Sequence, residues 1–465
     1  MKKSFLVVLI TLLLLSTAVF VSAGGQQGEK GGASVSKGPV QLEFWTRETQ
    51  SDRMATIQML IDTYTAMNPD VSIKLVPVDE NDMALNMRAA VAAGKIPSII
   101  EIDAEIAVAL GTEGILDTEA ADIMLNKVGK DRFFKGSLRL FESKDKGVYY
   151  AVPYHGMIQG IWYRADWFEK AGLEPPTTWE AVAKAAEYFN NPQKNTYGIL
   201  VGTMETESYD EQCFTPIAMS NNAGLFDKDG NLIFNSPEMK EALEYYARLA
   251  KTSPPGPQTW RARDYYLQGK MAMFFYSTYI MDDLAILEVA KGSLTSDNFK
   301  DLKGAEFDPD LVKNTKVVTT ISHKKDAGFG AVVSMAVPKQ SDPAVRDAAL
   351  DFLTYLYSPN AYITFLHMAV GGMMPVIEGV ADTDRFLNDP KGVYSRYGKE
   401  KIMEIVDGLN NIESFGLVEG NRIEAASVIY SKKIIPQMIY KVTQEGMDVD
   451  DAMNWAESAM KELIK

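Results

Sequence analysis

The chain has 465 residues, 46% of them hydrophobic, so it is long enough for two or three domains with buried cores and lacks the composition of a disordered protein. Its 47 basic and 62 acidic residues give a formal charge of −15, which argues against nucleic acid and anionic membranes as main partners. The single cysteine, Cys213, excludes an intrachain disulfide, so packing must stabilise the fold.

The N-terminus has the pattern of a signal peptide over residues 1–23. Lys2 and Lys3 precede an apolar run at residues 5–15, and small residues stand where signal peptidase would cut. We expect cleavage near Gly24 and a periplasmic or extracellular location. Loss of the two lysines leaves 45 basic against 62 acidic residues, a formal charge of −17. Retention as a membrane anchor is the alternative, although the apolar run is short for a span of ~20 residues.

Residues 24–38 contain six glycines among polar side chains and predict a flexible leader, with no cysteine for lipid attachment near the cleavage site. From residue 40 the pattern alternates between strand and helix. The expected strands are residues 40–46, 71–78 and 98–103, and the expected helices are residues 53–67 and 82–93. The third strand shows little polar and apolar alternation, as in a parallel sheet buried on both faces, so an α/β domain is predicted.

The segment 147–180 combines strand and helix signals and contains no catalytic motif. Residues 148–152 and 158–163 are rich in β-branched and aromatic side chains, and they predict two strands separated by a bend at Pro153.

Helix boundaries are marked in this segment and further along the chain. Gly172 is placed as a C-terminal cap, and Thr177 and Glu180 have capping-box spacing at the start of the next helix. Asp342 and Pro343 open a later helix. The apolar stripe of that helix is Val345, Ala349, Phe352, Leu353 and Leu356, and a final packing helix is expected over residues 449–463.

The order of these patterns resembles family 1 of the extracellular solute-binding proteins, which capture sugars and related solutes for ABC importers and include maltose-binding proteins. The first block of the resemblance is carried by Tyr150, Pro153, Tyr163, Asp166, Trp167, Ala171, Gly172, Leu173, Thr178, Trp179 and Glu180. Further blocks are residues 89–103 with 111–117, 269–284 and 329–359. Two residues depart from the pattern, since Arg164 stands where the family has Asn, and Ser98 where it has Asp.

The resemblance implies an α/β fold of two lobes, each a mostly parallel sheet flanked by helices, with a ligand cleft between the lobes. Lobe 1 would comprise residues 39–152 plus 318–370, and lobe 2 residues 153–317 plus 371–465. The chain would cross between the lobes near Pro153, around residues 310–320 and near Gly371, and these crossings would form a hinge.

Signatures of catalysis and metal binding are missing from the sequence. No GxSxG, Walker A, HExxH or paired CxxC motif occurs, and His155, His323 and His367 are widely spaced. We therefore expect no enzyme activity, no cofactor and no metal site. The 62 acidic residues guarantee many carboxylate pairs, so such pairs are weak evidence for glycoside hydrolysis.

Two predicted strands are followed by charged residues, and ligands of open α/β sheets bind at the carboxyl ends of strands. Asp103 and Glu105 follow one strand and could accept hydrogen bonds from sugar hydroxyls, although a solvated loop or a helix cap explains them equally well. Arg47 and Glu48 leave the first strand in a loop where the resemblance implies ligand contacts.

Aromatic and small residues complete the candidate site. A sugar offers an apolar face for an aromatic ring and hydroxyls for polar partners. Tyr276 and Ser277 end the strand of the third block, and the resemblance implies that Tyr279 faces the cleft. The remaining candidates are His155, Trp260, Gly371 and Gly372, for which a structural histidine, a loop aromatic and a flexible crossing are the alternative roles.

The resulting expectation is a monomeric binding protein that captures a sugar or oligosaccharide between its lobes and delivers it to the membrane permease of an ABC transporter with a separate ATPase subunit. A binding protein for a non-sugar solute, such as a sugar phosphate, polyamine or peptide, is the first alternative. A secreted carbohydrate-active enzyme is the second.

Overall fold

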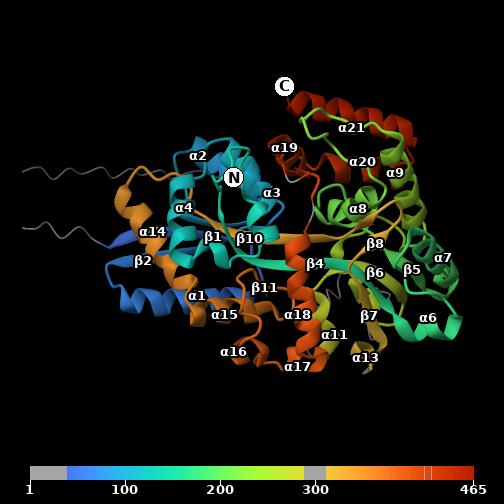
Figure 1. Ribbon diagram of the computed structural model, residues 1–465, viewed down its shortest axis with the longest axis horizontal. Helices are drawn as coiled ribbons and strands as arrows, with labels where there is room; N and C mark the ends of the chain where they lie inside the picture. The colour runs from blue at the N-terminus through green and yellow to red at the C-terminus, as the bar shows by residue number, and fades with distance from the viewer. Residues whose placement is uncertain (1–38, 287–309, 413, 420, 465) are drawn as a thin grey trace, which may run out of the picture. The chain divides into compact units, whose positions relative to one another are not determined.

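The computed structural model describes residues 39–286, 310–412, 414–419 and 421–464, and the predicted signal peptide and leader lie outside them. Figure 1 shows long strands at the centre of this part of the chain, with helices packed on both sides. The strands are β1 (Val40–Thr46), β2 (Val71–Pro77), β3 (Ile99–Asp103), β4 (Val152–Arg164), β5 (Tyr197–Leu200), β6 (Met271–Ser277), β7 (Thr315–Val318), β8 (Ile321–Ser322), β9 (Asp326–Ala327), β10 (Phe329–Ala336), β11 (Met374–Pro375), β12 (Leu417–Val418) and β13 (Asn421–Arg422).

The helices before residue 287 are α1 (Ser51–Met67), α2 (Met83–Ala92), α3 (Ala104–Thr112), α4 (Thr118–Val128), α5 (Lys135–Arg139), α6 (Ala165–Ala171), α7 (Trp179–Phe189), α8 (Tyr209–Ser220), α9 (Pro237–Ala250), α10 (Asp264–Leu267) and α11 (Ile280–Ala285). Those after residue 309 are α13 (Leu311–Asn314), α14 (Pro343–Leu356), α15 (Pro359–Leu366), α16 (Asp384–Leu387), α17 (Val393–Tyr397), α18 (Lys399–Asp407), α19 (Glu424–Ser431), α20 (Ile434–Thr443) and α21 (Val449–Leu463). Within the described ranges, no helix is both long and apolar enough to cross a membrane.

The central sheet of the described residues has nine strands in the order β2-β1-β3-β10-β4-β6-β5, and β7 and β11 also pair with β4. β1 is parallel to β2 and β3, and β5 is parallel to β6. β10 and β4 are antiparallel to their neighbours and connect the two parallel parts. The predicted α/β architecture is confirmed, and the sheet is antiparallel only around β10 and β4.

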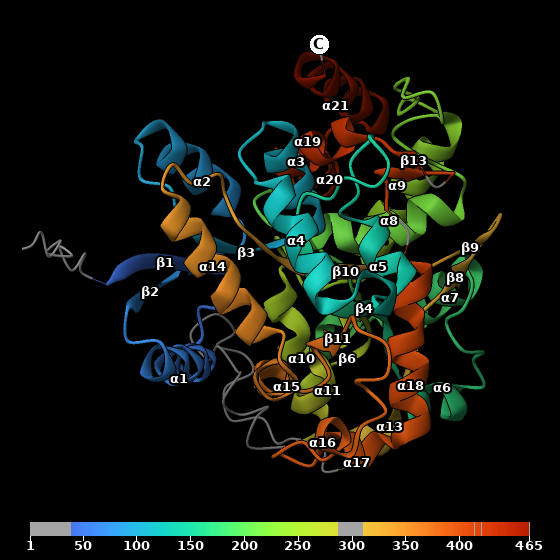
Figure 2. The same ribbon diagram turned by 60° about the vertical axis from the view of Figure 1, so that its left-hand side comes forward.

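Helices α14 and α1 pack against the parallel part at β1, β2 and β3, in which β3 is nearly fully buried, β1 is buried at alternate residues and β2 is only partly buried. α14 packs on β1 and α1 packs on β2, as Figure 2 shows. Phe44 of β1 lies edge-on to Phe352 of α14, with ring centroids 6.2 Å apart, and Phe352 lies 5.0 Å from Tyr64 of α1. The buried, non-alternating pattern predicted for residues 98–103 is confirmed by β3, in which Ile99, Ile100 and the next two residues are buried.

The prediction of two strands around Pro153 is wrong. Residues 152–164 form one continuous strand, β4, and every residue of it is buried. Its pairing with β10 shifts register where Val333 lies opposite His155 and Ser334 lies opposite Pro153, which leaves Tyr154 as an extra residue. This bulge lets the strand continue through a proline, because the residue that cannot donate a ladder hydrogen bond falls at the irregularity.

Most predicted helix ends are confirmed. Gly172 has φ +65° and caps α6, and Asp342 accepts a hydrogen bond from the Ala344 N–H at 2.9 Å at the start of α14. The predicted cap at Thr177 is displaced by one residue, because the Thr178 hydroxyl accepts from the Ala181 N–H at 3.2 Å.

The three predicted crossings lie on or beside strands that share β4, although β7 and β11 pair with different parts of it. Pro153 belongs to β4, residues 310–320 contain β7, and Gly371 precedes β11, and both β7 and β11 pair with β4. The lobe boundaries at residues 152, 318 and 371 stay predictions.

Candidate binding site

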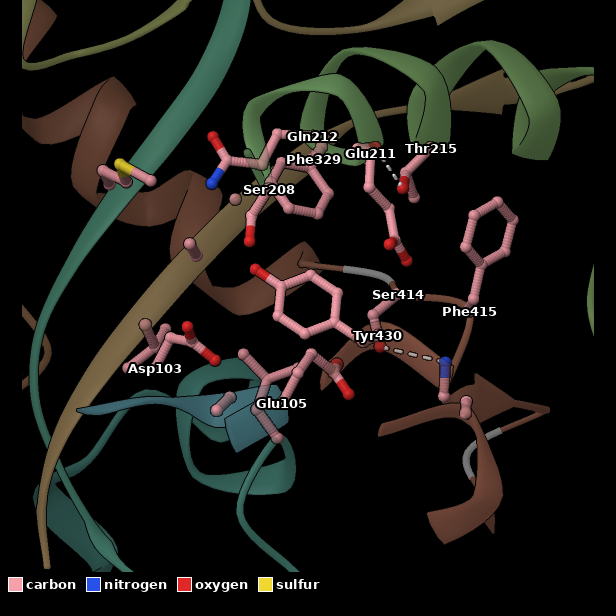
Figure 3. Close-up of a pocket in the computed structure, with 18 of the residues that line it drawn as sticks. Asp103, Glu105, Ser208, Glu211, Gln212, Thr215, Phe329, Ser414, Phe415 and Tyr430 are labelled. Carbon is pink, nitrogen blue, oxygen red and sulfur yellow. Dashed lines mark hydrogen bonds between the residues drawn. The ribbon is translucent and has the colours of Figure 1, made fainter. Parts of the chain in front are cut away.

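A cavity of about 770 Å³, partly open to solvent, is referred to below as the main cavity. Its walls come from residues after β1 and β2, the junction of β3 and α3, the start of α8, the start of β10, residues 414–416 and α19 (Figure 3). Three sequence-predicted residues, Arg47, Asp103 and Glu105, line it. The other lining residues are Glu80, Ala104, Leu140, Met157, Ser208, Glu211, Gln212, Thr215, Phe329, Gly330, Ala331, Val332, Ser414, Phe415, Gly416, Ala426 and Tyr430.

Two carboxylates of the main cavity stand at the start of α3. Asp103 caps this helix, since its Oδ1 accepts a hydrogen bond from the Ile106 N–H at 2.9 Å, and burial raises the pKa of its carboxyl. Glu105 accepts from Ser427 Oγ at 2.6 Å, and Arg422 Nη1 lies 3.5 Å from it. Asp103 is thus a helix cap, as one of the two sequence interpretations has it, and also a cavity wall.

Glu211 is a third carboxyl group of the main cavity, and it differs from the other two. Its side chain is 6% exposed, and none of the described residues hydrogen-bonds its carboxyl. Burial, with repulsion from Glu105 as the next cause, raises its pKa from 4.5 to about 8. At neutral pH the group is therefore mostly protonated and can donate a hydrogen bond as well as accept one.

Arg47 is the one cation among the described residues that line the main cavity, and Lys433 and Arg422 are bonded to residues of its lining. Arg47 forms an ion pair with Glu80. Lys433 Nζ donates to Asn81 Oδ1 at 2.8 Å and to Ser208 Oγ at 3.3 Å, and burial lowers the pKa of its ammonium group. Arg422 is held by Glu105 and also donates to a backbone carbonyl. The walls thus offer carboxyl groups to a ligand more readily than positive charge.

Aromatic rings supply the apolar part of the cavity. Figure 3 shows the Tyr430 ring among the carboxyl groups of Asp103, Glu105 and Glu211, all of which act on the pKa of its hydroxyl. Burial is the main cause that raises this pKa, so the hydroxyl stays neutral. With Phe329 and Phe415, the cavity combines rings with carboxyl groups, the combination that sugar recognition requires.

Two other predicted residues, Glu48 and His155, lie in a buried network beside this cavity. Arg53 Nη1 donates to Glu48 Oε2 at 2.7 Å, and His155 Nε2 lies 3.3 Å from Glu101 Oε1. The Thr46 hydroxyl also bonds Glu101. One ligand atom from each of Glu48, Glu101 and His155 lies within 4.8 Å of the others, a geometry that could hold a metal ion. The carboxylates are already bonded within the protein, so we assign the network a positioning role at the end of β1.

Tyr279 packs against this network rather than into the main cavity. Its ring faces the Arg53 guanidinium at 5.3 Å, and its ring edge lies directly over Gly372. Position 372 requires a glycine because the Tyr279 ring lies so close to the backbone there. A Cβ at this position would lie 2.1 Å from Tyr279 Cδ1.

We expect Gly372→Ala to destabilise the protein by roughly 1–3 kcal/mol, because Tyr279 must move to admit the methyl group. Urea unfolding measures the change. Gly224→Ala is the matched control, since its nearest neighbour would lie at an ordinary 3.7 Å, and it should change stability by less than about 0.5 kcal/mol. Equal effects of the two substitutions would contradict the proposed contact.

The remaining candidates are also outside the lining of the main cavity. Tyr276 and Ser277 are buried in β6. Gly371 has φ +92°, and its N–H donates to the Tyr394 hydroxyl at 3.1 Å. Trp260 packs against two guanidinium groups, those of Arg261 and Arg263, at 4.4 and 4.8 Å from its ring.

Comparison with known proteins assigns this arrangement to a family. The family model of the bacterial extracellular solute-binding proteins matches residues 48–363. The chain belongs to this family. Residues 48–363 include the ends of β3 and β6 and the first turns of α8, so the family match covers much of the wall of the main cavity.

Individual relatives of this solute-binding protein are distant. The putative ABC transporter periplasmic-binding protein YcjN of Escherichia coli (strain K12) is 28% identical over 427 residues, which cover 92% of this chain and 93% of the relative. The sn-glycerol-3-phosphate-binding periplasmic protein UgpB of Brucella abortus (strain 2308) is 26% identical over 292 residues, 59% of this chain and 64% of the relative.

A solved structure supports the fold. The ABC transporter solute-binding protein of Agrobacterium radiobacter K84 in complex with ribitol superposes with a TM-score of 0.72 at 20% identity, over 92% of this chain and 99% of that chain. The expected fold class, the α/β fold of two-lobed periplasmic binding proteins, is confirmed.

Sequence reasoning missed several residues of this solute-binding protein's cavity. Glu211 and Ser208 stand at the start of α8, the helix that follows β5, whereas Asp103 is the last residue of β3. The rule that directed attention to the carboxyl end of β3 points to the loop after β5 but not to these two residues, because a loop separates them from the end of that strand. Tyr430 lies within α19, and nothing in the pattern of that helix distinguishes a cavity tyrosine from a core tyrosine.

Proposed function

We propose that this protein captures an uncharged sugar or oligosaccharide in the main cavity and delivers it to the permease of an ABC transporter. The single observation that supports the proposal is the set of side chains that line the main cavity. Asp103, Glu105 and Glu211 can bond hydroxyls, Tyr430 and Phe329 can cover C–H faces, and Arg47, among the cations, is paired with a carboxylate.

A phosphorylated solute is the alternative that the relatives raise, because one of them is named as binding sn-glycerol 3-phosphate. Phosphate sites usually present arginine or lysine side chains, or several backbone N–H groups, to the phosphate oxygens. In the described lining of this cavity, Arg47 is the one cation and is paired with Glu80, while three carboxyl groups face the same space. The nearby Arg422 and Lys433 do not line it and are also bonded by protein groups. This arrangement supports a neutral solute.

We expect neutral sugars, and not sn-glycerol 3-phosphate, to raise the melting temperature of the purified protein. A ligand present at 100 times its Kd adds about 2.7 kcal/mol of stability, which a thermal shift assay detects easily. The panel pairs glucose with glucose 6-phosphate and glycerol with glycerol 3-phosphate, so the phosphate group is the only difference within a pair. Stabilisation confined to phosphates, polyamines or peptides would overturn the proposed solute class.

Catalysis is not part of the proposal, since the family consists of transport-associated binding proteins. The carboxyl groups of Glu105 and Glu211 face one cavity, as the acid pair of a glycosidase would. Incubation with chromogenic glycosides tests this directly. Turnover that disappears in Glu211→Gln would favour the enzyme alternative.

The mechanism of capture follows from the proposed lobes. Lobe 1 (residues 39–152 plus 318–370) supplies Asp103, and lobe 2 (residues 153–317 plus 371–465) supplies Glu211 and Tyr430. Only contacts that are stronger in the closed form shift the equilibrium toward closure, and a ligand held by both lobes makes such contacts. We further propose export by the N-terminal signal peptide and action as a monomer, which size-exclusion chromatography would test.

A further inference from the structure

The three carboxyl groups of the main cavity differ in what compensates their negative charge. Asp103 caps α3 and accepts a hydrogen bond from the Ile106 N–H at 2.9 Å. Glu105 accepts a hydrogen bond from Ser427 Oγ at 2.6 Å and lies 3.5 Å from the guanidinium of Arg422. Each of these two carboxylates thus has protein donors that stabilise its ionised form.

Glu211, near the start of α8, has no such compensation. Its side chain is 6% exposed, and none of the described residues hydrogen-bonds its carboxyl. Figure 3 shows this carboxyl pointing from α8 into the cavity. Water in the cavity can hydrogen-bond the group, but a water molecule brings no opposite charge. Burial without a paired cation therefore favours the protonated, neutral form.

The charged groups around Glu211 strengthen this preference. Burial is the main cause that raises its pKa to about 8, and the charges of Glu105 and Asp103 at the start of α3 raise it further. Lys433, which precedes α20, acts in the opposite direction, but its ammonium group is already hydrogen-bonded within the protein. An ionised Glu211 would thus be a third negative charge in the same cavity.

The other walls of the main cavity bring no unpaired charge, as far as the described residues show. Tyr430 of α19 faces the same space with a hydroxyl that burial keeps neutral. The start of β10 contributes the uncharged residues 329–332 to the lining. Arg47 and Glu80 are the remaining charged residues of the lining, and they pair with each other.

We propose that Glu211 must be protonated for capture, so that this protein releases its solute as the carboxyl ionises under mildly alkaline conditions. The inference rests on the proposed function. A solute in the main cavity displaces water from Glu211, and an uncharged solute supplies no positive charge in its place, so the bound protein favours the protonated carboxyl even more strongly. This carboxyl donates one hydrogen bond to a solute oxygen and accepts another from a hydroxyl. Ionisation removes the donated bond and leaves a buried, uncompensated charge beside the solute.

The test is the pH dependence of affinity, measured by titration calorimetry on wild-type protein and on Glu211→Gln. The probes are glucose, maltose and ribitol. The Kd of wild-type protein should be nearly constant up to about pH 7 and then rise by roughly 5- to 30-fold by about pH 9.5, because the carboxyl ionises between these values. Glutamine keeps a donor and an acceptor and does not ionise, so the Kd of Glu211→Gln should change by less than about twofold over the same range.

Proton uptake on binding gives a second readout, which a purely structural role of Glu211 would not produce. Near pH 8 about half of the unliganded wild-type protein is ionised at Glu211, so binding should take up a fraction of one proton. The uptake appears as a difference in apparent binding enthalpy between HEPES and Tris buffers. Glu211→Gln should show no such difference in uptake.

Asp210→Asn is the matched control. Asp210 precedes Glu211 in α8, is fully buried and has a pKa that burial raises well above its ordinary value, but it does not line the main cavity. This variant should keep the pH profile and the proton uptake of wild-type protein. Loss of both in Asp210→Asn would overturn the role of Glu211, because the effect would then belong to the start of α8 as a whole.

The remaining outcomes separate the inference from its premise. If a probe binds wild-type protein with an affinity that is constant or increases up to about pH 9.5, the proposed function stands and the role of Glu211 is wrong. A Glu211→Gln profile that matches the falling wild-type profile would overturn the role in the same way. If none of the three probes binds at any pH, the proposed function is wrong for this class of solute, and the role of Glu211 falls with it.

Discussion

Replacing Glu211 by glutamine should stabilise the unliganded protein by on the order of 3 kcal/mol at about pH 8.5, and by less than about 1 kcal/mol at about pH 5. Glu211 is 6% exposed on the wall of the main cavity, and burial, followed by the charge of Glu105, raises its pKa from 4.5 to about 8. Glutamine has the same shape and never ionises, so it removes the cost of burying a charge.

The sign of this pH dependence follows from proton binding. Between pH 4.5 and about pH 8, the unfolded chain has lost the Glu211 proton while the folded protein retains it, so unfolding releases a proton. The contribution of Glu211 to wild-type stability therefore falls as the pH rises through this window, and it is level below and above the window. The glutamine variant lacks this loss, so its advantage grows from pH 4.5 to pH 8 and then stays constant.

Urea unfolding of both proteins at a series of pH values measures the difference directly, because all other titrating groups are shared. Glu244→Gln removes the same charge from an exposed position on α9 and should change stability by less than about 0.5 kcal/mol at every pH. A difference between Glu211→Gln and wild type that does not vary with pH would show that Glu211 titrates normally.

Local physical chemistry explains why so much of the fold could be predicted from the sequence. The buried, largely apolar run of β3, the Gly172 cap of α6 and the Asp342 cap of α14 each depend on a few neighbouring residues. The prediction of a bend at Pro153 is wrong because the structure there depends on a residue that is distant in the sequence. A bulge opposite Val333, more than 170 residues away in the chain, absorbs the proline within β4, and no pattern near residue 153 reveals its partner strand.

The candidate site could be predicted only where it follows directly from strand ends. Asp103 was found because a carboxylate directly after a buried strand has a defined place in an open α/β sheet. Tyr279 is expected to face the ligand; its ring lies over Gly372 and Arg53 and is not part of the main cavity lining, so its contact with a ligand stays a prediction. The position of the Tyr279 ring depends on Gly372, a residue nearly 100 positions away in the sequence.

The largest loss of stability from a single substitution is expected for Tyr154→Ala, at about 3–5 kcal/mol. Tyr154 is the extra residue of the β4 bulge and is fully buried. Its ring centroid lies 4.9 Å from that of Tyr357, 5.2 Å from Tyr362 and 4.8 Å from Phe365. Alanine removes these edge contacts and leaves a cavity that the surrounding rings cannot fill without moving. Urea unfolding at neutral pH measures the loss.

Tyr154→Phe separates packing from hydrogen bonding at the same position. The Tyr154 hydroxyl donates to the Leu356 carbonyl at 3.1 Å, so its removal should cost about 1 kcal/mol, well below the cost of alanine. Tyr188→Ala, at a ring that is 63% exposed, should be nearly neutral. Because β4 and its neighbour β10 connect the two parallel parts of the sheet, loss of Tyr154 packing should also weaken sugar binding in the protein that remains folded. A Tyr154→Ala protein as stable as Tyr154→Phe would show that the bulge does not depend on this ring.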